Sequence, residues 1–201
     1  MNGAQDEGGA VALSPVALTR TTRETDVAVR LGGDGSEAST PIPIFTHFLE
    51  AMLRTWGQPA AVRATGDVAV DPHHLAEDVG IVLGQALGRF LPGYTGIARY
   101  GWSIVPMDDA LAEVALDLSG RAGCHVTSEP EGPVGGVDGE VFLEFFEGFC
   151  RGGTLTLHIA FRAGSNRHHR WEGAFKALGL ALRAATAPRE GGVLSTKGMI
   201  G

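Results

Sequence analysis

Residues 73–90 read HHLAEDVGIVLGQALGRF, and residues 168–186 read HHRWEGAFKALGLALRAAT. Each stretch opens with a His-His-x-x-Glu string and continues with apolar residues three and four positions apart. This spacing predicts two amphipathic helices, at about 74–91 and 168–186. The two stretches decide the fold, because the same sequence of elements precedes each of them.

A helical pattern at 44–56 and a strand pattern at 61–71, with a turn or bulge at Gly66-Asp67, precede the first string. A helical pattern at 140–151 and the strand pattern TLTLHIAFRAG at 154–164 precede the second. Alternation in the latter strand puts His158 on the face opposite its apolar residues. Strands are also expected at 17–31 and 113–121. The repeated order of helix, strand and HHxxE helix indicates an internal duplication.

The expected fold class is therefore α+β, with internally duplicated half-domains. Each half is a small mixed sheet with two helices packed on one face, and the two halves bury these faces together. We expect a flexible arm at 1–16 and one domain at 17–201, made of repeats at about 17–110 and 111–190 plus a C-terminal tail. Gly80, Gly84 and Gly88 form a stripe that permits close approach of another element, or tight helix–sheet packing within one chain.

Bulk composition excludes several classes of protein. The formal net charge of −7 disfavours binding to nucleic acid or to an anionic membrane surface. The sequence contains no apolar run of the length that a membrane span needs. Two cysteines do not make a disulfide framework, and the acidic, Gly-rich start does not resemble a signal peptide. We therefore expect a cytoplasmic protein.

The two HHxxE strings contain the candidate metal ligands. Residues four apart on a helix lie one above the other, so His73 and Glu77 can share a metal ion, as can His168 and Glu172. Adjacent residues are turned by about 100°, so each His pair is expected to serve two ions, one histidine each. Imidazole and carboxylate ligands without thiolate fit Mn²⁺, Fe²⁺, Co²⁺ or Zn²⁺.

The other histidines and the basic residues carry weaker signals. His158 lies off the apolar face and close enough in sequence to join the site. The pattern alone reads His47 as a core histidine and His125 as structural. Arg99, Arg121 and Lys197 lie in or after turn-rich stretches, where each is either a solvent-facing charge or part of an anion site. As a set beside two metals they suggest a phosphorylated small molecule as ligand.

Eight motifs covering residues 19–201 resemble the imidazoleglycerol-phosphate dehydratase family. They are RTTRET (20–25), HHLAEDVGIVLGQAL (73–87), RYG (99–101), VPMDDA (105–110), LDLSGR (116–121), LTLHI (155–159), NRHHRWEGAFKAL (166–178) and STKG (195–198). The resemblance implies a Mn-dependent hydro-lyase of histidine biosynthesis. Its reaction is the dehydration of D-erythro-imidazoleglycerol phosphate to imidazole acetol phosphate. Family members form homo-oligomers of 24 subunits, built from trimers whose interfaces complete the active sites.

The resemblance also implies residue roles. Two Mn²⁺ ions per active site bind the substrate ring as imidazolate, which favours loss of the hydroxyl on the neighbouring carbon. One ion takes His47, His74, His168 and Glu172, and the other takes His73, Glu77, His158 and His169. Glu24 is the implied base or proton shuttle, with Glu77 and Glu172 as competing candidates. The phosphate is implied to bind Arg99, Arg121, Ser195, Thr196 and Lys197.

The sequence departs from the family pattern beside His47. Thr46, Phe48 and Ala51 stand where the family usually has Asp, Met and Gln. Pro72 and Leu75 replace an Asp and a Thr around the first His pair. The altered segment at 46–51 favours one alternative, a paralogue that dehydrates a related phosphorylated azole compound. Two others are a non-catalytic metal-binding cage protein, which has no need of Glu24, Arg99, Arg121 and Lys197, and a dinuclear metal hydrolase. Such hydrolases commonly hold their ions ~3.5–4 Å apart, closer than divided His pairs would place them.

Overall fold

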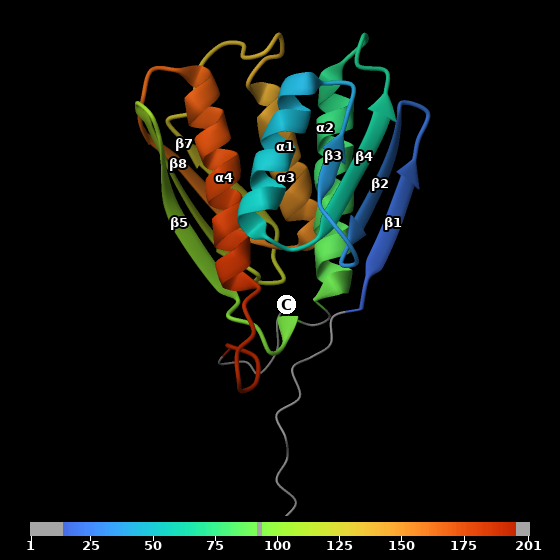
Figure 1. Cartoon of the computed structure of the whole chain (residues 1–201), viewed down its shortest axis with the longest axis vertical. Coiled ribbons are helices and arrows are strands. Elements are labelled where there is room, and N and C mark those ends of the chain that lie inside the picture. Colours follow the sequence, from blue (N-terminus) through green and yellow to red (C-terminus); the bar gives the residue numbers. More distant parts are fainter. Residues whose placement is uncertain (1–13, 92–93, 196–201) are drawn as a thin grey trace, which may run out of the picture.

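A computed structural model describes residues 14–91 and 94–195 of the chain (Figure 1). The first half contains β1 (Val16–Thr21), β2 (Thr25–Leu31), β3 (Glu37–Ser39), α1 (Pro43–Trp56), β4 (Ala60–Gly66) and α2 (Pro72–Phe90). The second half contains β5 (Tyr100–Met107), β6 (Ala110–Asp117), β7 (Gly123–Thr127), α3 (Glu140–Gly153), β8 (Thr156–Ala163) and α4 (Arg167–Ala185). The two halves therefore have the same order of elements.

The two sheets have the same topology. Their strand orders are β1-β2-β4-β3 and β5-β6-β8-β7. In each sheet the first three strands pair antiparallel, and the last strand pairs parallel to its neighbour. A parallel pair needs a crossover connection, which α1 provides between β3 and β4, and α3 between β7 and β8. This confirms the α+β class, the duplication and the mixed sheets.

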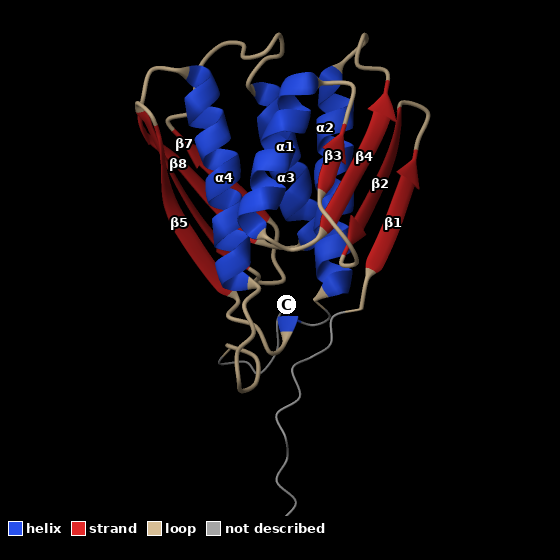
Figure 2. Cartoon of the chain, in the orientation of Figure 1, coloured by secondary structure: helices blue, strands red, loops and turns tan. Residues whose placement is uncertain are grey.

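The four helices lie between the two sheets (Figures 1 and 2). Helix α2 packs on β1, β2 and β4, and α4 packs on β5 and β6. The halves then meet through the helix pairs α2–α3 and α1–α4. Helices α1, α2 and α4 begin at the same end of the molecule (Figure 1). No helix in the described part of the chain is long and apolar enough to cross a membrane.

Aromatic side chains fill the space between the helices. Phe45 and Phe48 of α1 contact the rings of Phe142 and Phe175 from the second half. All four side chains are fully buried. Since such rings each bury a large apolar area, they supply much of the stabilisation between the halves. Strand β8 alternates as expected, with Leu157 and Ile159 buried and His158 exposed.

Two of the three glycines in the stripe, Gly80 and Gly84, meet another helix and not a sheet. Gly80 and Gly84 of α2 face the backbone of α3, where a Cβ at Gly80 would stand 2.8 Å from the nitrogen of Phe149. Gly148 returns the contact from α3, against the backbone of Glu77. The expected close approach is therefore confirmed, and the partner is the opposite half of the same chain.

Several expected element bounds differ from the structure. The strand expected at 17–31 is two strands, because the hydroxyl of Thr22 accepts hydrogen bonds from the backbone nitrogens of Glu24 and Thr25 and closes a turn. The sequence patterns did not predict β3, β5 or β7. Pairing of β5 with β6 puts β5 in the second half, whereas the expected boundary near residue 110 leaves it in the first. Residues 1–13 of the expected arm lie outside the described residues.

Candidate metal centre

Each HHxxE string forms the first turn of a helix. The side chain of Asp71 caps α2 by accepting a hydrogen bond from the backbone nitrogen of His73 at 2.9 Å. Asn166 caps α4 in the same way, accepting from the backbone nitrogen of His169 at 3.3 Å. Such caps satisfy the first amide groups of a helix and fix where it begins. The two strings are therefore presented at the same end of the molecule, with α2 and α4 on opposite sides of α1 and α3 (Figure 1).

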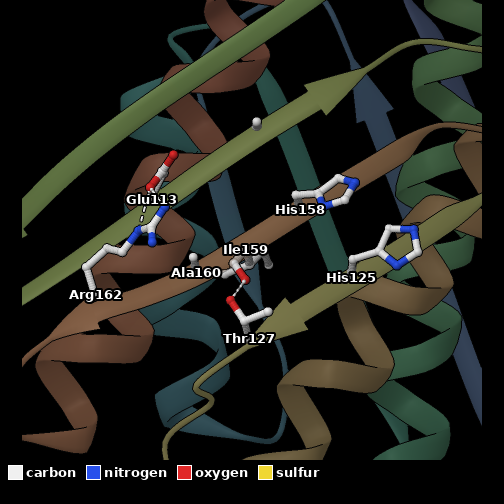
Figure 3. Close-up of a pocket in the computed structure, with 8 residues that line it drawn as sticks. Glu113, His125, Thr127, His158, Ile159, Ala160 and Arg162 are labelled. Carbon is white, nitrogen blue, oxygen red and sulfur yellow. Dashed lines mark hydrogen bonds and ion pairs between the residues drawn. The ribbon is translucent and has the colours of Figure 1, made fainter.

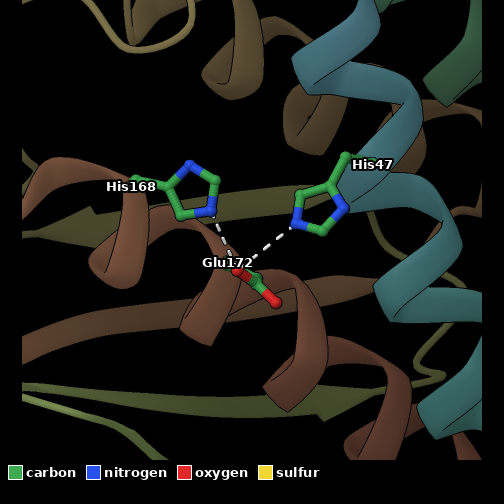
Figure 4. Close-up of side chains that lie close together, drawn as sticks. All are labelled: His47, His168 and Glu172. Carbon is green, nitrogen blue, oxygen red and sulfur yellow. Dashed lines mark hydrogen bonds and ion pairs between the residues drawn. The ribbon is translucent and has the colours of Figure 1, made fainter.

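His47, His168 and Glu172 form a group that can hold a metal ion (Figure 4). Nε2 of His168 lies 3.0 Å from Oε2 of Glu172, and Nε2 of His47 lies 3.4 Å from the same oxygen. One ligand atom from each residue falls within 4.8 Å of the others. The contact joins α1 of the first half to α4 of the second. His47, which the pattern alone read as a core residue, is half exposed and belongs to this group.

The carboxylate of Glu172 is held ionised. Burial raises the pKa of Glu172, but hydrogen bonds from Lys176 and His47 outweigh this and leave the pKa below its ordinary value. The Lys176 ammonium lies 2.7 Å from Oε1, one turn along the helix. Two imidazoles and an ionised carboxylate, without thiolate, form a donor set that suits borderline divalent ions. The three residues therefore fit the metal that the sequence predicts.

The three residues near His47 that differ from the family pattern determine how this histidine is surrounded. Thr46 bonds to Thr40, its hydroxyl oxygen standing 3.0 Å from the Thr40 backbone nitrogen, and so ties down the loop before α1. Phe48 is fully buried and packs edge-on against the ring of His168, with centroids 5.3 Å apart. Ala51 is buried and carries no polar side chain. Phe48 therefore packs against the rings of both His47 and His168, and position 46 supplies a hydroxyl bonded to Thr40 in place of a carboxylate.

His74 faces the turn between β1 and β2. Its Nδ1 lies 3.5 Å from Oε2 of Glu24, too far for a hydrogen bond. This nitrogen is buried and has no hydrogen-bond partner among the described residues. The side chain of Glu24 is half exposed. The structure thus brings the implied base beside one implied ligand, although His74 lies outside the three-residue group.

Asp78 anchors the turn that carries Glu24. This buried carboxylate accepts a hydrogen bond from the hydroxyl of Thr25 at 2.5 Å and from Nε of Arg20 at 2.8 Å. The RTTRET segment therefore folds so that Arg20, Thr22 and Thr25 fix the turn while Glu24 projects from it. Asp78 directly follows the first HHxxE string, but its contact with the turn at Glu24 has no signal in the sequence pattern.

The implied ligands of the second ion do not meet within one chain. Nδ1 of His73 lies 3.0 Å from Asp71, and Glu77 forms an ion pair with Arg151 at 2.5 Å. Nδ1 of His169 lies 2.8 Å from Asp109, which also accepts from the backbone nitrogens of Ser165 and Asn166. These bonds, that of His169 above all, hold the pKa of Asp109 well below its ordinary range.

Carboxylates at Nδ1 of His73 and His169 are typical of metal-binding histidines. A partner at one ring nitrogen fixes the ring orientation and leaves the other nitrogen for the ion. The sequence signal for Asp109 is the acidic pair in VPMDDA, which by itself does not reveal the contact with His169. His158 lies apart from these side chains, on the outer face of the second sheet beside His125 (Figure 3).

Of the implied phosphate ligands, the structure describes Arg99, Arg121 and Ser195, and Arg99 lies far from the three-residue group. The backbone nitrogen of Arg99 donates to the carbonyl of Ala185 at the end of α4. Thirteen residues at about 1.5 Å each separate Ala185 from Glu172, or roughly 20 Å. The guanidinium of Arg99 is buried, bonds to Asp117 at 2.7 and 3.0 Å, and donates to the carbonyl of Leu194. Its bonds to Asp117 raise the pKa of Arg99.

Arg121 and the tail complete that region. Arg121 follows β6 in the loop before β7, and its backbone nitrogen donates to the hydroxyl of Ser119. The backbone nitrogen of Ser195 donates to the carbonyl of Val193 at 2.8 Å. Thr196 and Lys197 lie outside the described residues. The bond from Arg99 to Leu194 holds the tail directly before the STKG segment.

Comparison with known proteins gives one consistent result. The family profile described as Imidazoleglycerol-phosphate dehydratase matches residues 40–182. A protein of that name from Deinococcus radiodurans is 44% identical, over 92% of this chain and 97% of its own length. Another of the same name, from Methanoculleus marisnigri, is 47% identical, over 90% of this chain and 96% of its own.

Solved structures agree. A crystal structure of IGPD from Pyrococcus furiosus in complex with (S)-C348 matches with a TM-score of 0.83 and 41% identity, covering 91% of this chain and 100% of that one. A crystal structure of imidazoleglycerol-phosphate dehydratase from Staphylococcus aureus matches with a TM-score of 0.75 and 30% identity, covering 86% and 99%. The matches extend over both halves of the fold.

Proposed function

Because the chain belongs to the imidazoleglycerol-phosphate dehydratase family, we propose that it removes water from D-erythro-imidazoleglycerol phosphate to give imidazole acetol phosphate. This is a reaction of histidine biosynthesis, and the cytoplasm is the proposed location. The observation that carries the proposal is the group of His47, His168 and Glu172, which joins the two halves. When bound, metal ions act as Lewis acids and orient the substrate ring.

Two Mn²⁺ ions per active site are the proposed cofactor. His47, His74, His168 and Glu172 hold one ion, and His73, Glu77, His158 and His169 hold the other. Three members of the first set already lie together. Support for the second set comes from Asp71 and Asp109, which orient His73 and His169 through Nδ1. The ring of Phe48 packs edge-on against the ring of His168 and so restricts its orientation.

Assembly of several chains is part of the proposal. His158 lies on the outer face of a sheet, away from the helix ends that carry His73 and His169. Its cross-strand row also contains Ala115 and the exposed Trp102. Trp102 belongs to an apolar row with Tyr100 and Ile104 that is exposed along β5, and a contiguous exposed apolar patch marks an interaction surface. We therefore propose a homo-oligomer of 24 subunits built from trimers, in which neighbouring chains complete each ion site.

Glu24 is the proposed base. Its carboxylate is half exposed and stands beside His74, on a turn that Asp78 fixes. The competing carboxylates are engaged elsewhere: Glu172 with Lys176, and Glu77 with Arg151. A base must be positioned and accessible to take a proton from the substrate. Glu24 therefore fits the role best, and Glu77 and Glu172 fit the role of ligands.

The proposed phosphate site comprises Arg99, Arg121, Ser195, Thr196 and Lys197. Arg99 supports this role through its bond to the carbonyl of Leu194, which orients the tail. The roughly 20 Å along α4 between this region and Glu172 supports a site shared between subunits. In such a site one chain binds the phosphate while the histidines of another hold the ring.

The test is turnover of imidazoleglycerol phosphate by the assembled, Mn²⁺-loaded protein, with Glu24→Gln as the variant. We expect the wild-type protein to form imidazole acetol phosphate and to rescue a histidine-requiring strain. Glu24→Gln should lower turnover by about 10²–10⁴-fold, the range for loss of a general base, while Mn²⁺ content stays the same. An assembled, metal-loaded wild-type protein without turnover would contradict the proposal.

A related phosphorylated azole compound is the second candidate substrate. It is favoured by Thr46, which bonds to Thr40, and by Ala51, which has no polar group where the family has Gln. Turnover of such a compound, without turnover of imidazoleglycerol phosphate, would support it. A non-catalytic cage does not explain why Asp78 and Thr25 hold Glu24 beside His74.

A further inference from the structure

His125 lies directly beside His158 on the outer face of the second sheet. The parallel register of β7 and β8 pairs the two residues across the strands. On the other side of His158 the row continues with Ala115 and Trp102. Both histidines are exposed in the chain. Their proximity is therefore fixed by backbone pairing and does not depend on a flexible loop.

The two imidazole rings share one hollow. Their centroids are 4.5 Å apart and the rings are tilted by 33° (Figure 3). The hollow has a volume of about 290 Å³, and Thr127 and Ala115 also line it. At its edge Glu113 and Arg162 form an ion pair at 2.5 Å, so their charges compensate each other. The imidazoles supply the ring nitrogens that line this hollow.

We propose that His125 is an additional metal-binding residue, which joins His158 on one borderline divalent ion. Nitrogen ligands lie about 2.0–2.1 Å from such an ion, so two of them on one ion stand about 3.0–3.5 Å apart. Small rotations of two rings with neighbouring centroids provide this separation. Placing the ion in the active site rests on the proposed ligand role of His158, whereas the chelate itself needs only the two rings.

An additional imidazole changes which metal the position favours. Imidazole suits Ni²⁺, Cu²⁺ and Zn²⁺, whereas carboxylate and water suit Mn²⁺. His125 should therefore strengthen the binding of Ni²⁺ more than that of Mn²⁺. The opposing view is that the two rings merely stack on the surface of the sheet. In that case removing His125 leaves metal affinity unchanged.

The experiment compares Ni²⁺ binding to the assembled full-length protein and two variants by equilibrium titration. His125→Val removes the ring and suits a strand. Thr127→Val is the matched control, because Thr127 lies on the same strand and lines the same hollow. We expect His125→Val to weaken one Ni²⁺ site per chain by tenfold or more, with less than threefold weakening for Mn²⁺. Thr127→Val should stay within twofold of wild type for both ions.

Histidine modification with diethyl pyrocarbonate assigns the affected site. Cleavage after arginine separates residues 122–151, with His125 as the one histidine, from residues 152–162, with His158 as the one histidine. In the wild type Ni²⁺ should protect His158 at the concentration that fills the site which His125→Val weakens. Unchanged Ni²⁺ affinity in His125→Val, or weakening of a site that does not protect His158, would overturn the inference.

The dehydratase activity and the metal-binding role of His125 can be tested independently of each other. Loss of Ni²⁺ affinity without any turnover of imidazoleglycerol phosphate leaves the histidine pair in place and rejects the dehydratase. Turnover combined with unchanged Ni²⁺ affinity in His125→Val rejects the pair and leaves the dehydratase in place.

Discussion

Asp78 is buried beneath the turn that carries Glu24, and its carboxylate holds both Thr25 and Arg20. Asp78→Asn removes the charge and weakens both contacts, so Glu24 shifts relative to His74. Misplacement of a catalytic group by about 1 Å can cost 10²-fold in rate. We expect turnover to fall by about 10–100-fold with Mn²⁺ content unchanged, as measured by steady-state kinetics and metal analysis.

The control for Asp78→Asn is Asp34→Asn, in an exposed loop of the first half. A double variant separates positioning from general loss of structure. If Asp78 acts through Glu24, adding Asp78→Asn to Glu24→Gln should change turnover by less than about twofold, because coupled residues are not additive. Full additivity of the two losses would contradict the positioning role.

Lys176 keeps the pKa of Glu172 low against the effect of burial. A carboxyl with a depressed pKa stabilises the folded, ion-binding state above its unfolded pKa of about 4.3, and this contribution is lost as the pH falls through the folded pKa. Lys176→Met should raise the pKa of Glu172, so protons compete with metal at higher pH. The measurement is Mn²⁺ affinity as a function of pH.

Arg183→Met, which removes an exposed cation from the same helix, is the comparison for Lys176→Met. It should leave the pH profile of Mn²⁺ binding unchanged. An identical acid limit in Lys176→Met and wild type would mean that Lys176 does not control the ionisation of Glu172.

At single positions, prediction from the sequence succeeded where the alternation of a strand was clear. Strand parity predicted the exposed position of His158, which the structure confirms. The proximity of His125 to His158 could not be predicted from the sequence, because only the pairing of β7 with β8 makes the two residues neighbours. The position of His47 was also not predictable from its own segment. Its helix pattern is that of a core residue, and only the contact of α1 with α4 brings it to Glu172. Long-range contacts of this kind leave no periodic signal in one chain segment.

At the scale of elements, the contact of α2 with α3 depends on glycine. A Cβ at Gly84 would overlap the backbone of α3 at Phe149 and Gly153. Gly84→Ala should therefore destabilise the protein by about 1–3 kcal/mol, as overpacking does, despite the higher helix propensity of Ala. The midpoint of denaturant unfolding at fixed protein concentration measures this change.

Gly88→Ala is the matched substitution on the same helix. There a Cβ would meet only the hydroxyl of Tyr94, at an ordinary distance of 3.5 Å. The variant should be neutral or more stable by up to about 1 kcal/mol, the propensity difference between Gly and Ala. Equal destabilisation by both substitutions would contradict the role given to the helix contact.

The helices were predictable because their apolar periodicity is regular and long. The pattern placed α1 at 44–56 and the structure has Pro43–Trp56. The sequence pattern did not predict strand β5, because apolar side chains, Tyr100 and Trp102 among them, occupy its exposed face. An edge strand whose outer face is apolar does not show the usual alternation of buried apolar and exposed polar residues.

At the scale of the whole molecule, the exposed row on β5 bears on assembly. Trp102 is 72% exposed in the single chain, and Ile104 is 58% exposed. Trp102→Glu puts a charge into the proposed interface, so we expect a smaller oligomer and loss of turnover. Light scattering coupled to size exclusion measures the mass. Thr19→Glu, on the exposed edge strand β1, is the control that should assemble normally. An unchanged mass for Trp102→Glu would remove this row from the interface.

The most direct test of the whole account is a crystal structure of the assembled protein loaded with Mn²⁺, with the ions located by anomalous scattering. The account predicts two Mn²⁺ ions per active site, with His73 and His74 on different ions and His168 and His169 likewise divided. One ion bound by two adjacent histidines, or HHxxE side chains that face solvent beside no ion, would contradict it.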